Sequence, residues 1–202
     1  MKKKKDQMAG RPVGLIVFGL GLLLVLVPVF VTMGYLRGQS SPARGGVPSL
    51  PNPSPLTVKD GPPAPDFAIE TLDGGRFVLS DYRGRVVVVY FMAGWCLSCV
   101  PEARALARLY AEYHDRGLEV LAVDAQFDES PADVDRFRRQ VGTNPPPDYR
   151  WAIDRKLQVV TTLGVRSLDT TIVIDPQGRI VYRDEVPTPY EILRQAVEAA
   201  LQ

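Results

Sequence analysis

The sequence predicts an α/β domain with a central mixed β-sheet flanked by helices, preceded by a transmembrane helix. After residue 64, apolar strand-like runs alternate with amphipathic helical patterns, which is typical of a sheet with helices on its faces. The last two strand-like runs are separated by a short turn, so the sheet should contain antiparallel as well as parallel pairs. Ahead of the domain, Val13 to Tyr35 carries no charge, and such a run is long enough to cross a bilayer.

The N-terminus divides into a basic segment and an apolar one. Residues 1–12 carry Lys2 to Lys5 and Arg11, and should stay in the cytoplasm because basic flanks favour that side. Residues 13–36 are predicted to be a transmembrane signal anchor. The alternative is a cleaved signal peptide, but its apolar region would normally span about 7–15 residues and end in small residues. We favour the uncleaved anchor, with the rest of the chain outside the cytoplasm.

Residues 37–63 are predicted to form a linker rich in Pro, Gly and Ser. Four prolines between Pro48 and Pro55 disfavour both helix and sheet and favour an extended, semi-rigid spacer. The globular domain should then occupy residues 64–202. The net charge of +1 argues against a nucleic-acid binder, which is usually strongly basic. Two cysteines and one histidine are too few for a four-ligand zinc site.

The first half of the domain shows a hairpin, two buried strands and a helix between them. The hairpin is predicted around Leu72 to Gly75, a turn-forming stretch. The strands are valine-rich apolar runs, which suit burial on both faces, and the helix has an apolar stripe. The predicted ranges are 66–71 and 76–79 for the hairpin, 86–92 and 118–124 for the strands, and 99–116 for the helix.

The second half continues with helices and a closing hairpin. Ser130, Pro131 and Asp133 predict a helix start, because serine caps, proline fits the first position and an acid suits the first turn. The segment from Thr143 to Tyr149 is predicted to be a proline-rich loop. The remaining predicted elements are a short helix at 155–163 ended by Gly164, a hairpin of 170–175 with 180–183, and a last helix to Leu201 opened by a capping box at 188–191.

Both cysteines lie in one motif, Cys96-Leu97-Ser98-Cys99, between a buried strand and an amphipathic helix. A Cys-x-x-Cys pair in that context is typical of a redox dithiol. Free N–H groups at the helix start stabilise a thiolate on the first cysteine, so Cys96 is the predicted nucleophile and Cys99 the resolving residue. The alternatives are half of a metal site or two inert core cysteines.

These features resemble the thioredoxin-like fold and, more narrowly, the membrane-anchored TlpA/ResA family of thiol–disulfide oxidoreductases. The matching stretches are residues 64–67, 73–75, 79–84, 95–102, 116–123 and 164–175. The resemblance implies a redox-active Cys96–Cys99 disulfide and reduction of protein disulfides outside the cytoplasm, in several relatives the haem-binding cysteine pair of apocytochrome c. It implies no cofactor, a membrane electron donor of the thiol-transferring type, and Trp95, Leu168 and residue 169 facing the substrate.

The resemblance also implies an acid/base role for Glu102, three residues after Cys99. Proton transfer by such a group is typically worth about 10²–10⁴-fold. The alternative is a first-turn glutamate favoured by the helix dipole. Tyr90 stands where thioredoxin has a buried aspartate, so the other usual proton acceptor is missing. Its loss favours the acid/base interpretation of Glu102.

One position departs from the family. Asp169 stands where relatives have a cis-proline facing the dithiol. A cis bond without proline costs about 3–4 kcal/mol, so the loop should differ from that of the family. A carboxylate there would disfavour the Cys96 thiolate, or it would join the two sulfurs around a metal, or it would simply point to water.

Three functions follow from these patterns. The first is a disulfide reductase. The second is a copper-handling protein for cytochrome oxidase assembly that uses the dithiol as ligands. The third is an oxidase, with the same chemistry run in reverse. Peroxidase chemistry is disfavoured, because Ala93 stands where a peroxidase would have Thr or Ser three residues before the cysteine.

Overall fold

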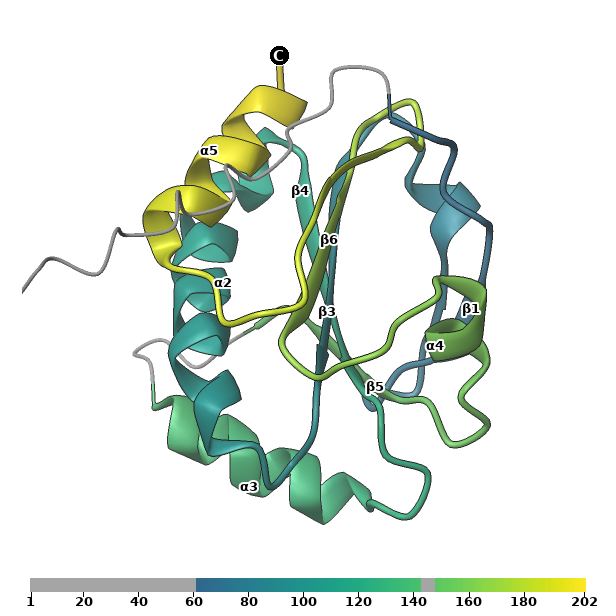
Figure 1. Cartoon of the computed structure of the whole chain (residues 1–202), viewed down its shortest axis with the longest axis vertical. Helices are drawn as coiled ribbons and strands as arrows, with labels where there is room; N and C mark the ends of the chain where they lie inside the picture. Colours follow the sequence, from purple (N-terminus) through teal and green to yellow (C-terminus); the bar gives the residue numbers. More distant parts are fainter. Residues whose placement is uncertain (1–60, 143–147) are drawn as a thin grey trace, which may run out of the picture. The chain divides into compact units, whose positions relative to one another are not determined.

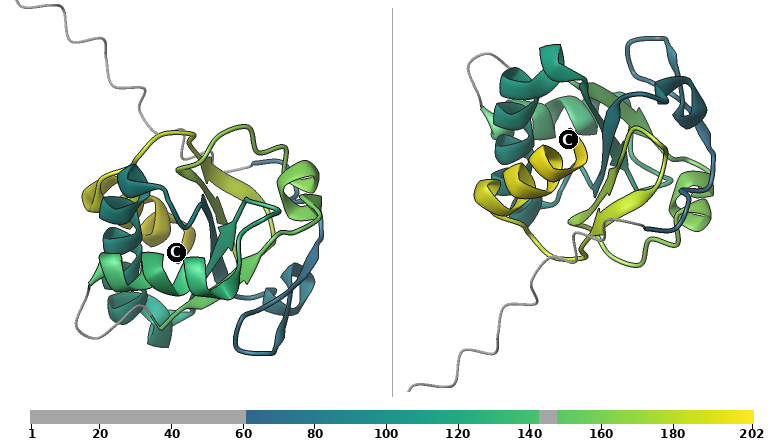
Figure 2. Two further views of the ribbon diagram at one scale, coloured as in Figure 1. Left: turned by 90° about the horizontal axis from the view of Figure 1, so that it is seen from below. Right: turned by 90° about the horizontal axis from the view of Figure 1, so that it is seen from above.

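The computed structural model describes residues 61–142 and 148–202. A five-stranded sheet in the order β5-β4-β3-β6-β7 lies at its centre (Figure 1, Figure 2). β3 pairs parallel with β4 and antiparallel with β6, which confirms the predicted mixed sheet. The strands are β3 (Val86–Met92), β4 (Leu118–Asp124), β5 (Arg150–Ile153), β6 (Thr170–Ile174) and β7 (Ile180–Arg183).

β3 is buried along its whole length because both faces of the sheet are covered. Its even-numbered residues pack with α2, α3 and α5, and its odd-numbered residues pack with α4 and the N-terminal hairpin. Figure 1 shows these two groups on opposite sides of the sheet. The covering elements are α2 (Val100–Tyr113), α3 (Pro131–Val141), α4 (Gln158–Thr162), α5 (Tyr190–Ala200), β1 (Ala68–Glu70) and β2 (Arg76–Val78). An uninterrupted apolar run is what such a strand requires.

The predicted helix at 99–116 is realised in three parts. The 3₁₀ turn η2 (Leu97–Cys99) leads into α2, and the 3₁₀ turn η3 (His114–Arg116) ends it. Gly117 then adopts a left-handed conformation with φ of 100°. The same role falls to Gly164, with φ of 63°, after α4. These two glycines occupy the positions where a left-handed residue commonly ends a helix.

The two predicted helix starts have different outcomes. α3 begins as expected, with Pro131 in its first turn and the backbone and hydroxyl of Ser130 donating to Asp133. The capping box predicted at 188–191 is wrong, because α5 begins after Pro189. The backbone N–H of Thr188 instead donates to Glu102. A buried carboxylate on α2 thus takes the donor that the capping box would have used within its own helix.

β5 was not predicted from the sequence. It has four residues, lies parallel to β4 at the sheet edge, and buries Trp151 and Ala152. A strand this short gives no usable periodicity, and it follows a proline-rich stretch. The helix expected at 155–163 is present only as the shorter α4.

The N-terminal hairpin is present, with β1 and β2 paired antiparallel. Contacts with β7 and its turn begin within the predicted linker, since the Ile180 N–H donates to the Pro62 carbonyl at 2.9 Å. The predicted basic segment 1–12 and anchor 13–36 lie outside the described residues. Within 61–142 and 148–202, no helix is both long and apolar enough to span a bilayer.

Asp154 caps α4 from within the preceding turn. It is buried, and its two carboxylate oxygens accept from the backbone N–H groups of Gln158 and Val160, each at 2.9 Å. We predict that Asp154→Ala lowers the free energy of unfolding by about 1–2 kcal/mol, as loss of a helix cap does. Asp154→Asn should lose less because one acceptor remains. Urea unfolding with an unchanged m-value measures this, with the exposed Asp128→Ala as control. Equal stability of Asp154→Ala and wild type would contradict the capping role.

Candidate active site

The two cysteines form a disulfide where β3 passes into α2. The bond between Cys96 and Cys99 confirms the predicted pairing, with the two Cα atoms 5.4 Å apart. Cys96 directly precedes η2, which continues into α2, so the pair lies at a helix start as expected. Cys96 and Cys99 are 3% and 0% exposed, whereas Trp95 and Leu97 are 62% and 72% exposed. The sulfurs therefore lie beneath a rim of apolar side chains.

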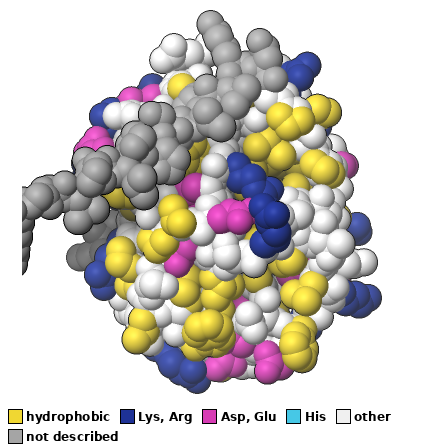
Figure 3. Space-filling view, in the orientation of Figure 1, with side chains coloured by type: hydrophobic (Ala, Val, Ile, Leu, Met, Phe, Trp, Pro, Cys, Tyr) yellow, Lys and Arg dark blue, Asp and Glu magenta, His cyan; other side chains and the backbone are white. Residues whose placement is uncertain are grey.

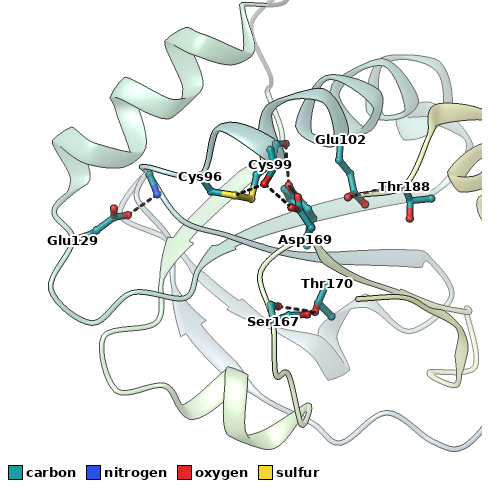
Figure 4. The surroundings of a disulfide bond; sticks show 11 residues. Cys96, Cys99, Glu102, Glu129, Ser167, Asp169, Thr170 and Thr188 are labelled. Carbon is teal, nitrogen blue, oxygen red and sulfur yellow. Dashed lines mark hydrogen bonds between the residues drawn. A yellow bond between two sulfur atoms is a disulfide. The ribbon is translucent and has the colours of Figure 1, made fainter. Parts of the chain in front are cut away.

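Glu129 holds the turn that carries the disulfide. Its Oε2 accepts from the backbone N–H of Gly94 at 2.6 Å (Figure 4). A Cβ on Gly94 would lie 2.8 Å from this oxygen and 3.0 Å from the Asp133 carbonyl. A side chain at position 94 would therefore require Glu129 and the start of α3 to shift.

A second carboxyl group lies behind this turn, at the end of β4. Asp124 is fully buried, and its Oδ1 accepts from the Gln126 N–H. Its Oδ2 has no partner among the described residues. Burial, with a further contribution from Glu129, raises the pKa of Asp124 to about 8. Asp124 therefore keeps its proton to a higher pH than an ordinary aspartate does.

The backbone at Asp169 explains why this chain has no proline at the position where the family has one. Its φ is 57°, and its backbone N–H donates to the Phe91 carbonyl of β3 at 2.9 Å. Proline can neither adopt this φ nor donate that hydrogen bond. Asp tolerates the left-handed region better than most residues. The loop before β6 therefore takes a course that excludes the proline of relatives.

The side chain of Asp169 points into the protein toward the disulfide (Figure 4). It is 5% exposed, so the alternative of an aspartate pointing to water is wrong. Its carboxylate and the sulfurs of Cys96 and Cys99 offer three atoms within 4.8 Å of one another.

Of the three residues predicted to face the substrate, Trp95 is exposed and Leu168 packs partly against the core. Their substrate contacts stay a prediction.

Two hydroxyl groups hold the Asp169 carboxylate. The Tyr90 hydroxyl lies 3.0 Å from Oδ1 and also 2.9 Å from the Cys99 carbonyl oxygen. The Ser98 hydroxyl donates to Oδ2 at 3.1 Å and lies 3.3 Å from the Cys96 sulfur. Hydrogen bonds thus link the carboxylate to both halves of the Cys-x-x-Cys motif.

Glu102 is buried on α2, with 1% of its surface exposed. Its Oε1 accepts from the Thr171 hydroxyl at 2.6 Å and its Oε2 from the Thr188 N–H at 3.1 Å. Burial raises the pKa of Glu102 to about 8, and the charges of Asp184 and Asp169 add to the effect. A carboxyl group that titrates near neutrality suits acid/base work, and the role predicted for Glu102 stays a prediction.

Sequence reasoning missed three residues of this site. Tyr90 was interpreted only as the loss of an acceptor, although a hydroxyl in a wholly buried strand needs a polar partner. Ser98 lies inside the motif, but its contact with Asp169 depends on the loop conformation. Glu129 gave no sequence signal, because its contact with Gly94 joins segments far apart in the chain.

The comparisons with known proteins agree with this geometry. A model of the AhpC/TSA family matches residues 61–183. The chain belongs to this family. Within it, the chain is similar to thiol–disulfide oxidoreductase ResA of Geobacillus thermodenitrificans, with 37% identity over 123 residues covering 61% of this chain and 67% of that one. ResA of Bacillus subtilis is 33% identical over 125 residues, 62% of this chain and 66% of its own length.

A solved structure extends the likeness to the fold. A putative thiol:disulfide interchange protein DsbE from Chlorobium tepidum matches with a TM-score of 0.62 and 31% identity. The match covers 72% of this chain and 99% of that one. The ResA relatives are matched over about two thirds of their length. The chain therefore groups with the ResA/DsbE-type thiol–disulfide oxidoreductases and has their Cys-x-x-Cys pair.

The raised pKa of Glu102 gives a pH-dependent stability. The folded protein binds the proton of the Glu102 carboxyl group more tightly than the unfolded chain does. The contribution of this group to the free energy of unfolding is therefore complete below about pH 4.5 and is lost as the pH rises toward 8. For one group the slope is at most about 1.4 kcal/mol per pH unit. We predict that Glu102→Gln removes this slope, because a glutamine amide can accept from Thr188 and donate to Thr171.

Urea unfolding at pH 5, 7 and 9 tests the Glu102 prediction. The difference between wild type and Glu102→Gln isolates this group, because Asp124 contributes equally to both curves. The variant should gain stability relative to wild type as pH rises. A difference that stays constant from pH 5 to 9 would show that Glu102 is ionised throughout.

Proposed function

We propose that this chain is an extracytoplasmic thiol–disulfide oxidoreductase that reduces protein disulfides through Cys96 and Cys99. The observation that carries the proposal is the disulfide between these residues at the strand-to-helix junction. The chain has no other cysteine, so the pair has no third thiol with which to rearrange. A disulfide closed across four residues at a helix start is suited to repeated opening and closing.

The reaction proceeds in two exchanges. The Cys96 thiolate attacks one sulfur of the target disulfide, and a mixed disulfide forms as the first target thiolate leaves. The Cys99 thiolate then attacks the Cys96 sulfur, and the second target thiolate leaves. Two electrons pass from the dithiol to the target. Glu102 supplies a buried carboxyl group for proton exchange with the dithiol. The resemblance to the TlpA/ResA family implies this role for a glutamate three residues after the second cysteine.

The rim of the site supports a protein substrate. Trp95 and Leu97 flank Cys96 and expose large apolar surfaces. Figure 3 views the molecule in the orientation of Figure 1. It shows apolar side chains gathered on the lower part of the face toward the viewer, where the lower end of β3 lies in Figure 1. An extended peptide would cover these side chains while presenting its disulfide to Cys96. In line with the resemblance, the proposed target is the cysteine pair of apocytochrome c during cytochrome c-type biogenesis.

The location and the electron source complete the proposal. The basic residues 1–12 and uncharged run 13–36 support a single-pass anchor in the cell membrane, with the catalytic domain outside the cytoplasm. Cytosolic reductants do not reach that side. Electrons therefore come from a membrane protein that passes them on through a dithiol of its own.

Copper handling is the second candidate, since Cys96, Cys99 and Asp169 offer three atoms within 4.8 Å. The observations favour it less. The two sulfurs are bonded to each other, and a carboxylate oxygen is a poor partner for Cu(I), which prefers soft ligands. The dithiol enzyme accounts for the same three groups without a metal.

Trapping of the intermediate tests the enzyme. In Cys99→Ser, Cys96 still attacks target disulfides but the mixed disulfide is not resolved, so covalent adducts should accumulate in cells. Non-reducing electrophoresis and mass spectrometry detect them, and a reductant should release them. The matched control is the double variant Cys96→Ser/Cys99→Ser, which should give none.

Two outcomes would overturn parts of this proposal. Absence of any adduct, together with one tightly bound copper per reduced wild-type protein, would favour the copper-handling function. A wild-type protein that is entirely disulfide-bonded in cells with an intact electron donor would reverse the direction and indicate an oxidase. The reductase predicts mostly dithiol when thiols are alkylated at the moment of lysis.

Labelling from outside the cell tests the location. Because the chain has only two cysteines, a membrane-impermeant maleimide should label the reduced pair in intact cells. The matched control is Lys4→Cys in a chain with Cys96→Ser and Cys99→Ser. Its thiol should react only after the membrane is permeabilised. Labelling of the native pair only after permeabilisation would place the domain in the cytoplasm.

A further inference from the structure

Among the residues that the structure describes, Asp169 is the acidic residue whose carboxylate groups with both sulfurs. One of its carboxylate oxygens and both sulfurs are within 4.8 Å of one another. In Figure 4, Asp169 lies between the disulfide and Glu102. The oxygens of Glu102 are engaged with Thr171 and Thr188 instead. Asp169 is therefore a second carboxyl group, besides Glu102, that is placed to exchange a proton with a cysteine.

The hydrogen bonds around Tyr90 leave room for one more proton. Its hydroxyl has a single hydrogen but lies within hydrogen-bond distance of two acceptors, the Cys99 carbonyl at 2.9 Å and Asp169 Oδ1 at 3.0 Å. Burial raises the pKa of Tyr90 above its ordinary value, so the hydroxyl keeps its hydrogen. Both contacts draw on this one hydrogen, so Asp169 Oδ1 keeps a lone pair with which it can accept a proton.

We propose that Asp169 is the proton acceptor for Cys99 when the mixed disulfide is resolved. This inference rests on the proposed function and adds a residue to it. The φ of 57° and the hydrogen bond from its backbone to Phe91 fix the side chain in place before the reaction. Such pre-positioning is what makes a proton acceptor effective.

The step balances as follows. Cys99 gives its proton to the Asp169 carboxylate, and its thiolate forms a bond to the Cys96 sulfur. The bond between Cys96 and the target breaks, and the target leaves as a thiolate that takes a proton from water. The proton on Asp169 stays in the contact with Tyr90 while the disulfide exists. When the dithiol donor reduces the disulfide, Cys99 leaves as a thiolate and takes this proton back.

Several polar groups surround Asp169. Tyr90 and Ser98 hold its two oxygens, and the sulfurs lie on one side. Two further carboxyl groups bear on the site, because Glu102 experiences the charges of both Asp169 and Asp184.

Asp169→Asn is the sharpest variant. Asparagine tolerates the left-handed conformation and keeps the backbone hydrogen bond, but it accepts no proton at neutral pH. The experiment follows a single turnover of reduced full-length protein with a small disulfide that carries a chromophore. The first exchange and the resolving step are timed separately by quenching in acid and mass spectrometry. The surface variant Asp135→Asn is the matched control, since Asp135 lies exposed on α3.

We expect Asp169→Asn to form the mixed disulfide at least as fast as wild type and to resolve it at least tenfold more slowly. General acid–base catalysis is typically worth about 10²–10⁴-fold, so tenfold is a low threshold. The pH profile should change as well. Resolution by the variant should rise about tenfold per pH unit between pH 6 and 8, because it waits for a thiolate formed without help. Wild type and Asp135→Asn should vary much less.

The failures are distinguishable. If wild type forms no mixed disulfide through Cys96, the proposed function fails. If the mixed disulfide forms but Asp169→Asn resolves it within twofold of wild type, the role of Asp169 is refuted. A slower variant that keeps the pH profile of wild type would also refute it, because misplaced sulfurs alone would explain the delay. Asp169→Gly, which accepts φ of 57° without strain, repeats the test should the asparagine variant not fold.

Discussion

The active site depends on a hydroxyl group inside a wholly buried strand. β3 has both faces covered, so the Tyr90 hydroxyl finds no water and must be paired within the protein. Its two partners are the Cys99 carbonyl at the start of α2 and Asp169 before β6. One oxygen atom therefore ties the disulfide turn and the facing loop to the central strand. The same packing that stabilises the sheet fixes the distance between a carboxylate and two sulfurs.

The site is also surrounded by acids that are costly to bury. Burial raises the pKa of Asp124 and of Glu102 to about 8, and neither has a cation as its hydrogen-bond partner. Glu129 adds a hydrogen bond to Gly94 on the other side of the turn. A stable fold would not need so many carboxyl groups in its interior. Their position around one disulfide is better explained by chemistry that exchanges protons near neutral pH.

The fold could be predicted from sequence where local pattern and packing agree. The valine run of β3, the caps at Ser130 and the turn before β7 each require only neighbouring residues. Prediction failed where a distant group decided the outcome. The N–H of Thr188 turns to Glu102, 86 residues away, instead of capping its own helix. β5 is a strand because β4 offers a free edge, and four residues carry no period of their own. Cys96, Cys99 and Glu102 followed from motif and resemblance, whereas Glu129 required the folded chain.

Asp169 shows how two departures from the family pattern belong together. Thioredoxin has a buried aspartate where this chain has Tyr90, and relatives have a proline where this chain has Asp169. The two changes complement each other, since the buried Tyr90 hydroxyl is a donor and the buried Asp169 carboxylate is an acceptor. Together they place a carboxylate beside the sulfurs, and this carboxylate comes from the loop before β6 instead of from β3. In the reductase that we propose, a negative charge there would disfavour the Cys96 thiolate and favour the disulfide, which would make the dithiol the stronger reductant. The exchange of positions thus fits a protein that gives electrons away.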